Sequence, residues 1–204
     1  GFVSVEVDPR LARDTSGTLD SARSLHKRIN KPNVLIKIPA TRESIPAVQT
    51  MISEGRSVNV TLIFSLSRYV EVMEAYISGL ESFSGDLSKI SSVASFFISR
   101  TDTEVDKRLD EIGSQKATDL KGQAAVALGQ VAYSLFKETF SGPRWEALES
   151  RGARAQRPLW ASTSTKNPSY VDTLYVDTLI GPNTVNTLPN NTIEAFEDHG
   201  TVAR

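Results

Sequence analysis

The sequence predicts an α/β protein with a parallel β-sheet, and two observations lead to this prediction. Six apolar segments have the length and composition of strands, and a helical pattern of apolar residues separates each segment from the next. Strands that alternate with helices form βα units, and successive βα units build a parallel sheet.

Each element follows from local residue patterns. The strands are short runs of Val, Leu, Ile and Phe, and several of them meet a proline, which cannot continue a hydrogen-bonded ladder. The helices carry apolar residues three and four positions apart; Thr101 and Glu104 form a capping-box pattern before one of them, and Gly113 ends it. The expected strands are residues 3–7, 34–38, 58–64, 92–98, 157–162 and 184–189. The expected helices are residues 18–30, 44–55, 67–80, 101–113, 117–140 and 171–179, followed by a partly helical tail from 192 to 204.

Polar residues inside the strands favour a barrel over a doubly wound sheet. In a doubly wound sheet both faces contact helices and are apolar. Here Glu6, Lys37, Asn59 and Thr61 lie opposite the helix-facing valines and isoleucines, which suits a shared barrel interior. The expected fold is therefore a (β/α)8 barrel of the TIM type, in which reacting groups lie at the C-terminal ends of strands. Because such barrels usually take about 250 residues, we expect residues 1–204 to form one domain with about six of the eight βα units.

Composition excludes several classes of function. The net charge of −1 provides no basic surface for nucleic acid or anionic lipid. Without cysteine there is no disulfide, thiolate chemistry or Cys-ligated zinc. No apolar run has the length of a membrane span, and no signal-peptide pattern is present. The two histidines, His26 and His199, lie far apart in the chain among polar and charged residues, which is typical of surface residues. These features indicate a cytoplasmic enzyme or binding protein.

Lys37 is the most informative single residue, because lysine is almost never fully buried unless it is paired or used. One interpretation is a desolvated amine with a lowered pKa that attacks a carbonyl to form a Schiff base. The other is a strand-edge lysine whose stem lies on the sheet and whose ammonium reaches water. The strand around Lys37, taken alone, favours the second interpretation.

Ordinary structural explanations also exist for the other polar residues when each is taken alone. Glu6 could be a solvated strand residue, Asn59 and Thr61 could be satisfied core residues, and Arg100 could be a surface ion-pair partner. An acid, a lysine and an amide–hydroxyl pair on the same faces of three successive strands are rarely a coincidence, so the joint pattern favours a functional site.

Six segments extend this pattern along nearly the whole chain. They are VEVDPR (5–10), LIKIPAT (35–41), VNVTLIFS (58–65), SFFISR (95–100), LWASTSTKNP (159–168) and YVDTLIGPNTVNT (175–187). In this order they resemble consecutive signatures of the transaldolase family, the class I Schiff-base enzymes of the pentose phosphate pathway, in its larger bacterial branch. An ordered match of this extent is far more specific than any single motif.

The resemblance implies a reaction and its catalytic residues. Lys37 would add to the C2 ketone of a ketose phosphate such as sedoheptulose 7-phosphate or fructose 6-phosphate, and the imine would accept electrons during C3–C4 cleavage. A dihydroxyacetone unit would then pass to an aldose phosphate. Glu6 and Thr61 match the residues that position and activate water. The resemblance implies no cofactor and no metal.

The same resemblance implies substrate-binding residues. Asn59 and Ser95 match partners of the dihydroxyacetone hydroxyls, and Phe97 matches an aromatic wall of the pocket. Arg100 matches the phosphate-binding arginine, whose planar fork suits bidentate contacts. Ser162 matches a phosphate-contacting serine.

One substrate-binding position departs from the family pattern. The family usually has a second arginine two residues after the phosphate-contacting serine, and this chain has Ser164 there. We assign the substitute role to the nearest cation, Lys166.

A larger departure concerns the start of the pattern. The resemblance implies two βα units before Glu6 and an aspartate on the first strand that takes the C4 hydroxyl proton. We therefore expect that the parent protein is a longer transaldolase and that these 204 residues need not be active on their own. An open barrel would expose strand edges that favour pairing with another copy, so a homo-oligomer is one expectation.

Two alternatives stay open. One is another class I aldolase, such as a fructose 6-phosphate or deoxyribose-phosphate aldolase, which would release free product instead of transferring it. The other is a non-catalytic barrel fragment that binds phosphosugars or serves in assembly.

Overall fold

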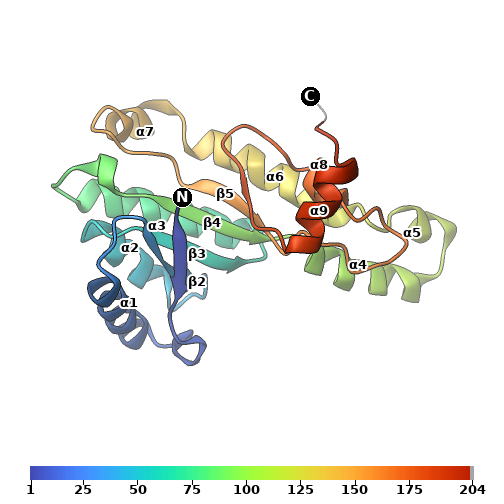
Figure 1. Ribbon diagram of the computed structural model, residues 1–204, viewed down its shortest axis with the longest axis horizontal. Helices are drawn as coiled ribbons and strands as arrows, with labels where there is room; N and C mark the ends of the chain where they lie inside the picture. Colours follow the sequence, from blue (N-terminus) through green and yellow to red (C-terminus); the bar gives the residue numbers. More distant parts are fainter. Residues whose placement is uncertain (203–204) are drawn as a thin grey trace. The chain divides into compact units, whose positions relative to one another are not determined.

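A computed structural model describes residues 1–202 of the chain, in which strands alternate with helices (Figure 1). The strands are β1 Val3–Glu6, β2 Val34–Pro39, β3 Val58–Ile63, β4 Ser92–Phe97, β5 Arg157–Ala161 and β6 Val185–Asn186. The helices are α1 Thr15–Ile29, α2 Ile45–Ser53, α3 Leu66–Ser82, α4 Ser99–Ile112, α5 Gln115–Asp119, α6 Ala124–Thr139, α7 Gly142–Glu149, α8 Leu174–Asp177 and α9 Asn190–His199. The predicted partly helical tail contains α9, and its last residues, 203 and 204, lie outside the described residues.

Within residues 1–202 the six strands form one sheet in the order β1-β2-β3-β4-β5-β6. The pairs β1–β2, β2–β3 and β5–β6 are parallel. Strands that neighbour each other in both sequence and sheet, with helices between them, are the arrangement of a partial (β/α)8 barrel. The predicted fold class is therefore confirmed, and the organisation of residues 1–204 as one barrel domain stays a prediction.

The chain contains two compact units, which are described separately. The first unit comprises Gly1–Ser95 and Leu135–Arg157, and the second comprises Phe96–Ser134 and Pro158–Arg204.

The core of the first unit lies between the strands and α1, α2 and α3. Helix α1 contacts β2, and α2 and α3 contact β3 and each other. Ile36, Ile38, Val58 and Val60 are completely buried, and each such side chain contributes about 1.5–3 kcal/mol to stability. Helices α2 and α3 approach closely at Gly79, where a Cβ atom would lie 2.7 Å from Ile52. The four buried strand residues alternate with the polar residues of β2 and β3. Their packing in the core therefore fixes the direction in which the polar side chains point.

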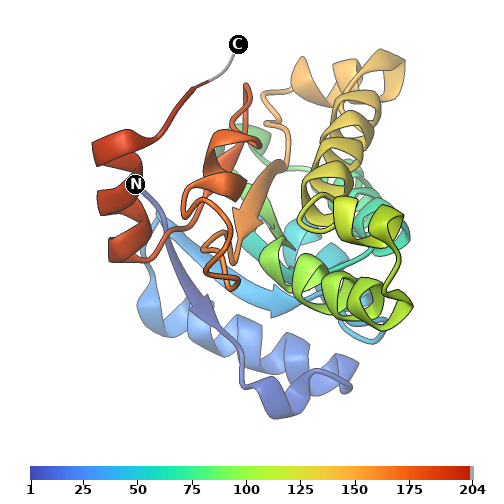
Figure 2. The same ribbon diagram turned by 90° about the vertical axis from the view of Figure 1, so that its right-hand side faces the viewer.

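The core of the second unit centres on Trp160. Its ring meets the Phe96 ring edge-on at a centroid distance of 6.4 Å. Its indole Nε1 donates to the carbonyl of Leu179 at 2.8 Å. Gly129 of α6 lies against the Leu179 side chain. Helices α4 and α5 and the part of α6 up to Ser134 follow one another in this unit (Figure 2).

Two predicted helix boundaries are wrong. Helix α4 begins at Ser99, with Ile98 as an N-cap that makes no side-chain capping bond, so the predicted capping box does not form. Asp102 is instead buried inside the helix and binds residues of other segments. The predicted helix 117–140 is interrupted at Gly122, whose φ of 74° favours glycine and separates α5 from α6.

One described helix was not expected from the sequence. Helix α7 is short and begins with Gly142 and a proline, so it carries little helical periodicity. Among residues 1–202, no helix is both long enough and apolar enough to cross a membrane.

Strand β3 departs from simple alternation at its C-terminal end. The alternation predicts that Leu62 shares the apolar face of Val58 and Val60, yet Leu62 has a φ of 60° and is 40% exposed. Ile63 is buried in its place. A left-handed residue inside a strand reverses the local direction of the side chains, which is why the alternation fails here.

Candidate functional site

The register of the first three strands places three of the predicted site residues in one row. Glu6 of β1 pairs with Lys37 of β2, and Lys37 pairs with Asn59 of β3. Side chains at paired positions of parallel strands leave the same face of the sheet, so this row follows directly from the backbone.

Lys37 forms an ion pair within this row. Its Nζ lies 3.3 Å from Oε2 of Glu6, and the two side chains are 29% and 42% exposed. The amine is therefore neither sealed in the core nor free in solvent. A half-buried amine next to a carboxylate can exchange a proton with it and can still meet a molecule that enters from solvent.

Asn59 is held in one orientation by two serines. Ser95 Oγ donates to Asn59 Oδ1 at 2.7 Å, and Asn59 Nδ2 donates to Ser4 Oγ at 2.9 Å. Asn59 and Ser95 are nearly completely buried. Because both ends of the amide have partners, the side chain cannot rotate without losing hydrogen bonds.

Thr61, like Gln156, is a residue of the first unit with a buried oxygen atom that has no hydrogen-bond partner among the described residues. Thr61 is completely buried, and its Oγ1 is the atom concerned. An unpaired buried hydroxyl typically costs about 1–3 kcal/mol. Such a group needs an explanation, and a water molecule or ligand hydroxyl that completes it is one. The strained Leu62 follows it directly.

In the second unit, the start of α4 lies against the end of β5. The Ser99 N–H donates to the Ser162 carbonyl at 3.0 Å, and the two hydroxyls are also 3.0 Å apart. Ser162 has a φ of 56°. The exposed Arg100 stacks with its Cζ atom 4.9 Å from the centre of the Phe97 ring. A cation and hydroxyls at a helix N-terminus are suited to bind an anion.

Lys166 and Ser164 are brought together. Lys166 Nζ donates to Ser164 Oγ at 2.7 Å. The ammonium therefore reaches the position from which the resemblance led us to expect an arginine side chain.

The predicted site residues fall into two sets. The first unit contains Glu6, Lys37, Asn59, Thr61 and Ser95. The second unit contains Phe97, Arg100, Ser162 and Lys166. Each set makes the contacts described above within its own unit.

Sequence reasoning missed two residues that hold these sets. Ser4 supports Asn59, and the alternation of the first strand, which places Ser4 on the same face as Glu6, was a usable signal. Ser99 binds Ser162, and no local pattern marks it, because its partner lies far along the chain.

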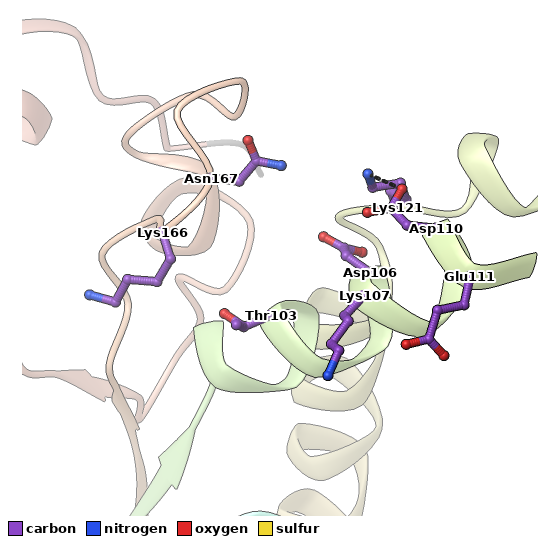
Figure 3. Close-up of a pocket in the computed structure, with 8 residues that line it drawn as sticks. All are labelled: Thr103, Asp106, Lys107, Asp110, Glu111, Lys121, Lys166 and Asn167. Atoms are coloured by element: carbon purple, nitrogen blue, oxygen red, sulfur yellow. Dashed lines mark hydrogen bonds and ion pairs between the residues drawn. The ribbon is translucent and has the colours of Figure 1, made fainter. Parts of the chain in front are cut away.

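A cavity of about 540 Å³ lies beside α4 in the second unit. Figure 3 shows Asp106 pointing from α4 into the space opposite Lys166 and Asn167, while the ammonium groups of Lys107 and Lys166 point away from it. Within residues 1–202, no cluster of three or more His, Asp or Glu side chains could hold a metal.

Glu6 also lines a cavity of about 700 Å³ in the first unit. Asp8 and Arg10 line it as well, and hydrogen bonds from Arg10 lower the pKa of Asp8 to about 2. The Asp8 carboxylate therefore stays ionised and paired with Arg10 at neutral pH. Glu6, the other acid of this cavity, has no arginine partner among the described residues.

Comparison with known proteins gives a consistent result. Residues 1–204 match the family model described as Transaldolase/Fructose-6-phosphate aldolase. The chain is 56% identical over 206 residues to a protein named transaldolase from Mycolicibacterium paratuberculosis, and 58% identical over 205 residues to one from an Arthrobacter species. A transaldolase from Mycobacterium tuberculosis is 55% identical over 206 residues. These matches cover 99% of this chain and 55% of each relative, so the chain spans about half the length of the curated relatives it matches.

Proposed function

Because this chain belongs to the transaldolase/fructose-6-phosphate aldolase family, we propose that its site is that of a transaldolase. The proposed reaction moves a dihydroxyacetone unit from sedoheptulose 7-phosphate or fructose 6-phosphate to an aldose phosphate, as a step of the pentose phosphate pathway in the cytoplasm. The name of the relatives, transaldolase, supports transfer. Since the chain spans about half of each relative, the proposal concerns the activity of the whole protein.

The observation that carries the proposal is the ion pair between Lys37 and Glu6, in register with the buried Asn59. A Schiff-base lysine needs a proton acceptor within reach and an opening to substrate. A separation of 3.3 Å and a partly exposed amine meet both requirements.

The proposed reaction proceeds through an imine and an enamine on Lys37. Nζ of Lys37 adds to the C2 carbonyl, and loss of water gives a protonated imine. The electron pair of the C3–C4 bond moves into this imine while the C4 hydroxyl gives its proton to a base, and the shortened aldose leaves. The resulting enamine adds to the aldehyde of the acceptor, and water then cleaves the imine and frees Lys37.

Polar neighbours have separate proposed roles. Glu6 exchanges protons with the water that leaves and returns, and Thr61 binds that water through its hydroxyl. The lack of a protein partner for Thr61 Oγ1 among the described residues supports this role. Asn59 and Ser95 bind the dihydroxyacetone hydroxyls, and their mutual hydrogen bond keeps them ready to do so.

We further propose that residues of the second unit bind the phosphate group. Arg100 offers a guanidinium held by stacking on Phe97, which we propose as an aromatic wall of the sugar site. Ser162 offers a hydroxyl beside the α4 N-terminus. Lys166 offers the second cation through its contact with Ser164.

Borohydride trapping tests the Schiff base. The chain is incubated with fructose 6-phosphate and sodium borohydride, and intact mass spectrometry measures the covalent adduct. We expect an adduct in the unmodified chain, and none in Lys37→Ala or in Lys37→Arg, which retains a cation beside Glu6.

Lys31→Ala is the matched control, because Lys31 is an exposed lysine just before the same strand. Its adduct yield should equal that of the unmodified chain. An equal yield in the Lys37 variants would overturn the proposal. Free dihydroxyacetone released without an aldose acceptor would instead favour the aldolase activity that the family description also names.

A further inference from the structure

The buried face of α4 carries two aspartates one helical turn apart. Asp102 is 1% exposed and Asp106 is 8% exposed. Asp102 accepts from the Ala125 N–H at 2.7 Å and from the Tyr175 hydroxyl at 2.8 Å. Burial raises the pKa of the Asp102 carboxyl, although both hydrogen bonds act in the opposite direction.

Asp106 repeats this arrangement toward the segment that follows β5. Its carboxylate accepts from the Gly122 N–H at 3.0 Å and from the Tyr170 hydroxyl at 2.5 Å. The Tyr170 ring packs on Gly122 so closely that a Cβ atom there would lie 2.9 Å from the ring. We name Asp106, Gly122 and Tyr170 the clasp.

The clasp can work throughout the physiological pH range. Burial first, and then the hydrogen bond to Asp106, raise the pKa of Tyr170 to about 12. The phenol therefore stays protonated, and it donates to a carboxylate that accepts two hydrogen bonds.

The clasp holds one end of the segment formed by residues 163–169. The other end is held where Ser162 bonds to Ser99 at the start of α4. This segment carries Lys166, and α4 carries Arg100 as its second residue. The segment is thus fastened to α4 both before and after Lys166.

A free segment of this length would lose conformational entropy on binding a ligand, because every residue that becomes ordered opposes binding. A segment that is fixed at both ends has less conformational entropy to lose when it binds a ligand. In Figure 3, Lys166 and Asn167 lie opposite α4 across an open cavity into which Asp106 points, and the ammonium group of Lys166 points away from this cavity.

We propose that the clasp is a positioning device for anion binding in the second unit: it holds the segment carrying Lys166 beside the α4 N-terminus, so that a phosphate group meets a preordered site. Tyr170 is thus a positioning residue, which acts through the segment and does not touch the phosphate. The sugar-phosphate identity of the ligand rests on the proposed function.

Tyr170→Phe tests this role, because it removes the hydroxyl and keeps the ring on Gly122. Inorganic phosphate is titrated into the chain, and the amide resonances of Arg100 and Lys166 are followed by NMR. We expect the phosphate dissociation constant to rise roughly tenfold, as for the loss of one hydrogen bond to a charged group. Tyr133→Phe is the matched control, since it removes a hydroxyl that binds the Pro182 carbonyl elsewhere in the unit; its dissociation constant should not change.

Two Asp106 variants separate positioning from general stability. Asp106→Asn can still accept from Gly122 through its oxygen and donate to the Tyr170 oxygen, so it should bind phosphate nearly as the unmodified chain does. Asp106→Ala loses both hydrogen bonds and should weaken binding at least as much as Tyr170→Phe. A merely structural clasp would lower the melting temperature and leave the phosphate affinity of the folded chain unchanged.

The outcomes distinguish this inference from the proposed function. An unmodified chain that does not bind phosphate, or an affinity unchanged in Tyr170→Phe and Asp106→Ala, overturns the clasp. Borohydride trapping of dihydroxyacetone, which has no phosphate, reports on Lys37 alone. If the unmodified chain forms no dihydroxyacetone adduct, but binds phosphate and shows the expected effects of Tyr170→Phe and Asp106→Ala on the phosphate dissociation constant, the Schiff-base proposal is overturned and the clasp is supported.

Discussion

Two adjacent residues at the end of β3 carry local energetic costs. Thr61 buries a hydroxyl without a partner among the described residues, and Leu62 adopts a left-handed conformation. Each cost is about 1–3 kcal/mol. Such costs persist only where the surroundings enforce them, and they concentrate at functional sites. The position of Thr61, two residues beyond Asn59, agrees with its proposed role in binding water.

Leu62 offers a test of this strain. A β-branched residue is less tolerant of a positive φ than leucine, and asparagine is more tolerant. Leu62→Val should lower the free energy of unfolding by about 1–2 kcal/mol, whereas Leu62→Asn should leave it nearly unchanged, since the side chain is 40% exposed and buries little area. Urea unfolding measures both variants. Equal effects of Val and Asn would show that lost contacts, and not backbone conformation, decide the stability at this position.

At the scale of elements, a histidine joins α9 to the loop before α8. His199 Nε2 lies 2.8 Å from Asp172 Oδ1, and its Nδ1 lies 3.1 Å from Asp198 Oδ2. Hydrogen bonds to Asp172 and then Asp198 raise the pKa of His199, and the same histidine lowers the pKa of Asp172.

This contact predicts a pH-dependent attachment of α9. Because the folded pKa of His199 is raised, its stabilising effect is fully present below the unfolded value of about 6.5 and is lost as pH rises through the folded pKa. At low pH the effect disappears again when Asp172 is protonated. Amide hydrogen exchange in α9 should therefore be slower at pH 5.5 than at pH 8.5, after correction for intrinsic rates. In His199→Asn this difference should vanish; if it persists, another group controls α9.

The sequence predicts those elements whose causes are local. Strands β1 to β4 follow from runs of Val, Ile and Phe, and the row of Glu6, Lys37 and Asn59 follows from alternation in parallel strands. The α4 N-terminus was misplaced because the helix already begins at Ser99, so that Thr101 and Glu104, which match a capping box, lie inside it.

The candidate site was only partly accessible to sequence reasoning. Local pattern and family resemblance together suggested Lys37 and its neighbours, and Ser4 could have been added. The clasp could not, since Asp106 and Tyr170 are 64 positions apart and neither stands out in its own segment. Left-handed residues such as Leu62 also leave no mark in an apolar run.

At the scale of the molecule, the described sheet ends in β1 on one side and in β6 on the other. Strand β6 has two residues and β1 has four. The Val3 side chain of β1 is 59% exposed. Among the described residues no strand pairs with the outer edge of β1, and such an apolar edge is a template for pairing with another chain. The expectation of a homo-oligomer can therefore be tested at β1.

Val3→Lys should reduce concentration-dependent self-association of the chain, because a lysine on an edge strand opposes edge-to-edge pairing. Sedimentation velocity over a range of concentrations measures this. Val70→Lys is the matched control, since Val70 is 46% exposed on α3 and lies on no strand edge. Equal reductions in both variants would indicate nonspecific apolar association.

The sequential strand order has a consequence for how the protein is made. Each strand beyond β1 pairs with the strand that precedes it in the chain. During synthesis from the N-terminus, every newly emerged βα unit can dock on an edge that is already complete, and no strand has to be inserted between two others. The row of Glu6, Lys37 and Asn59 can thus assemble once β3 has left the ribosome, before Ser162 and Lys166, which we propose to bind phosphate, have been made.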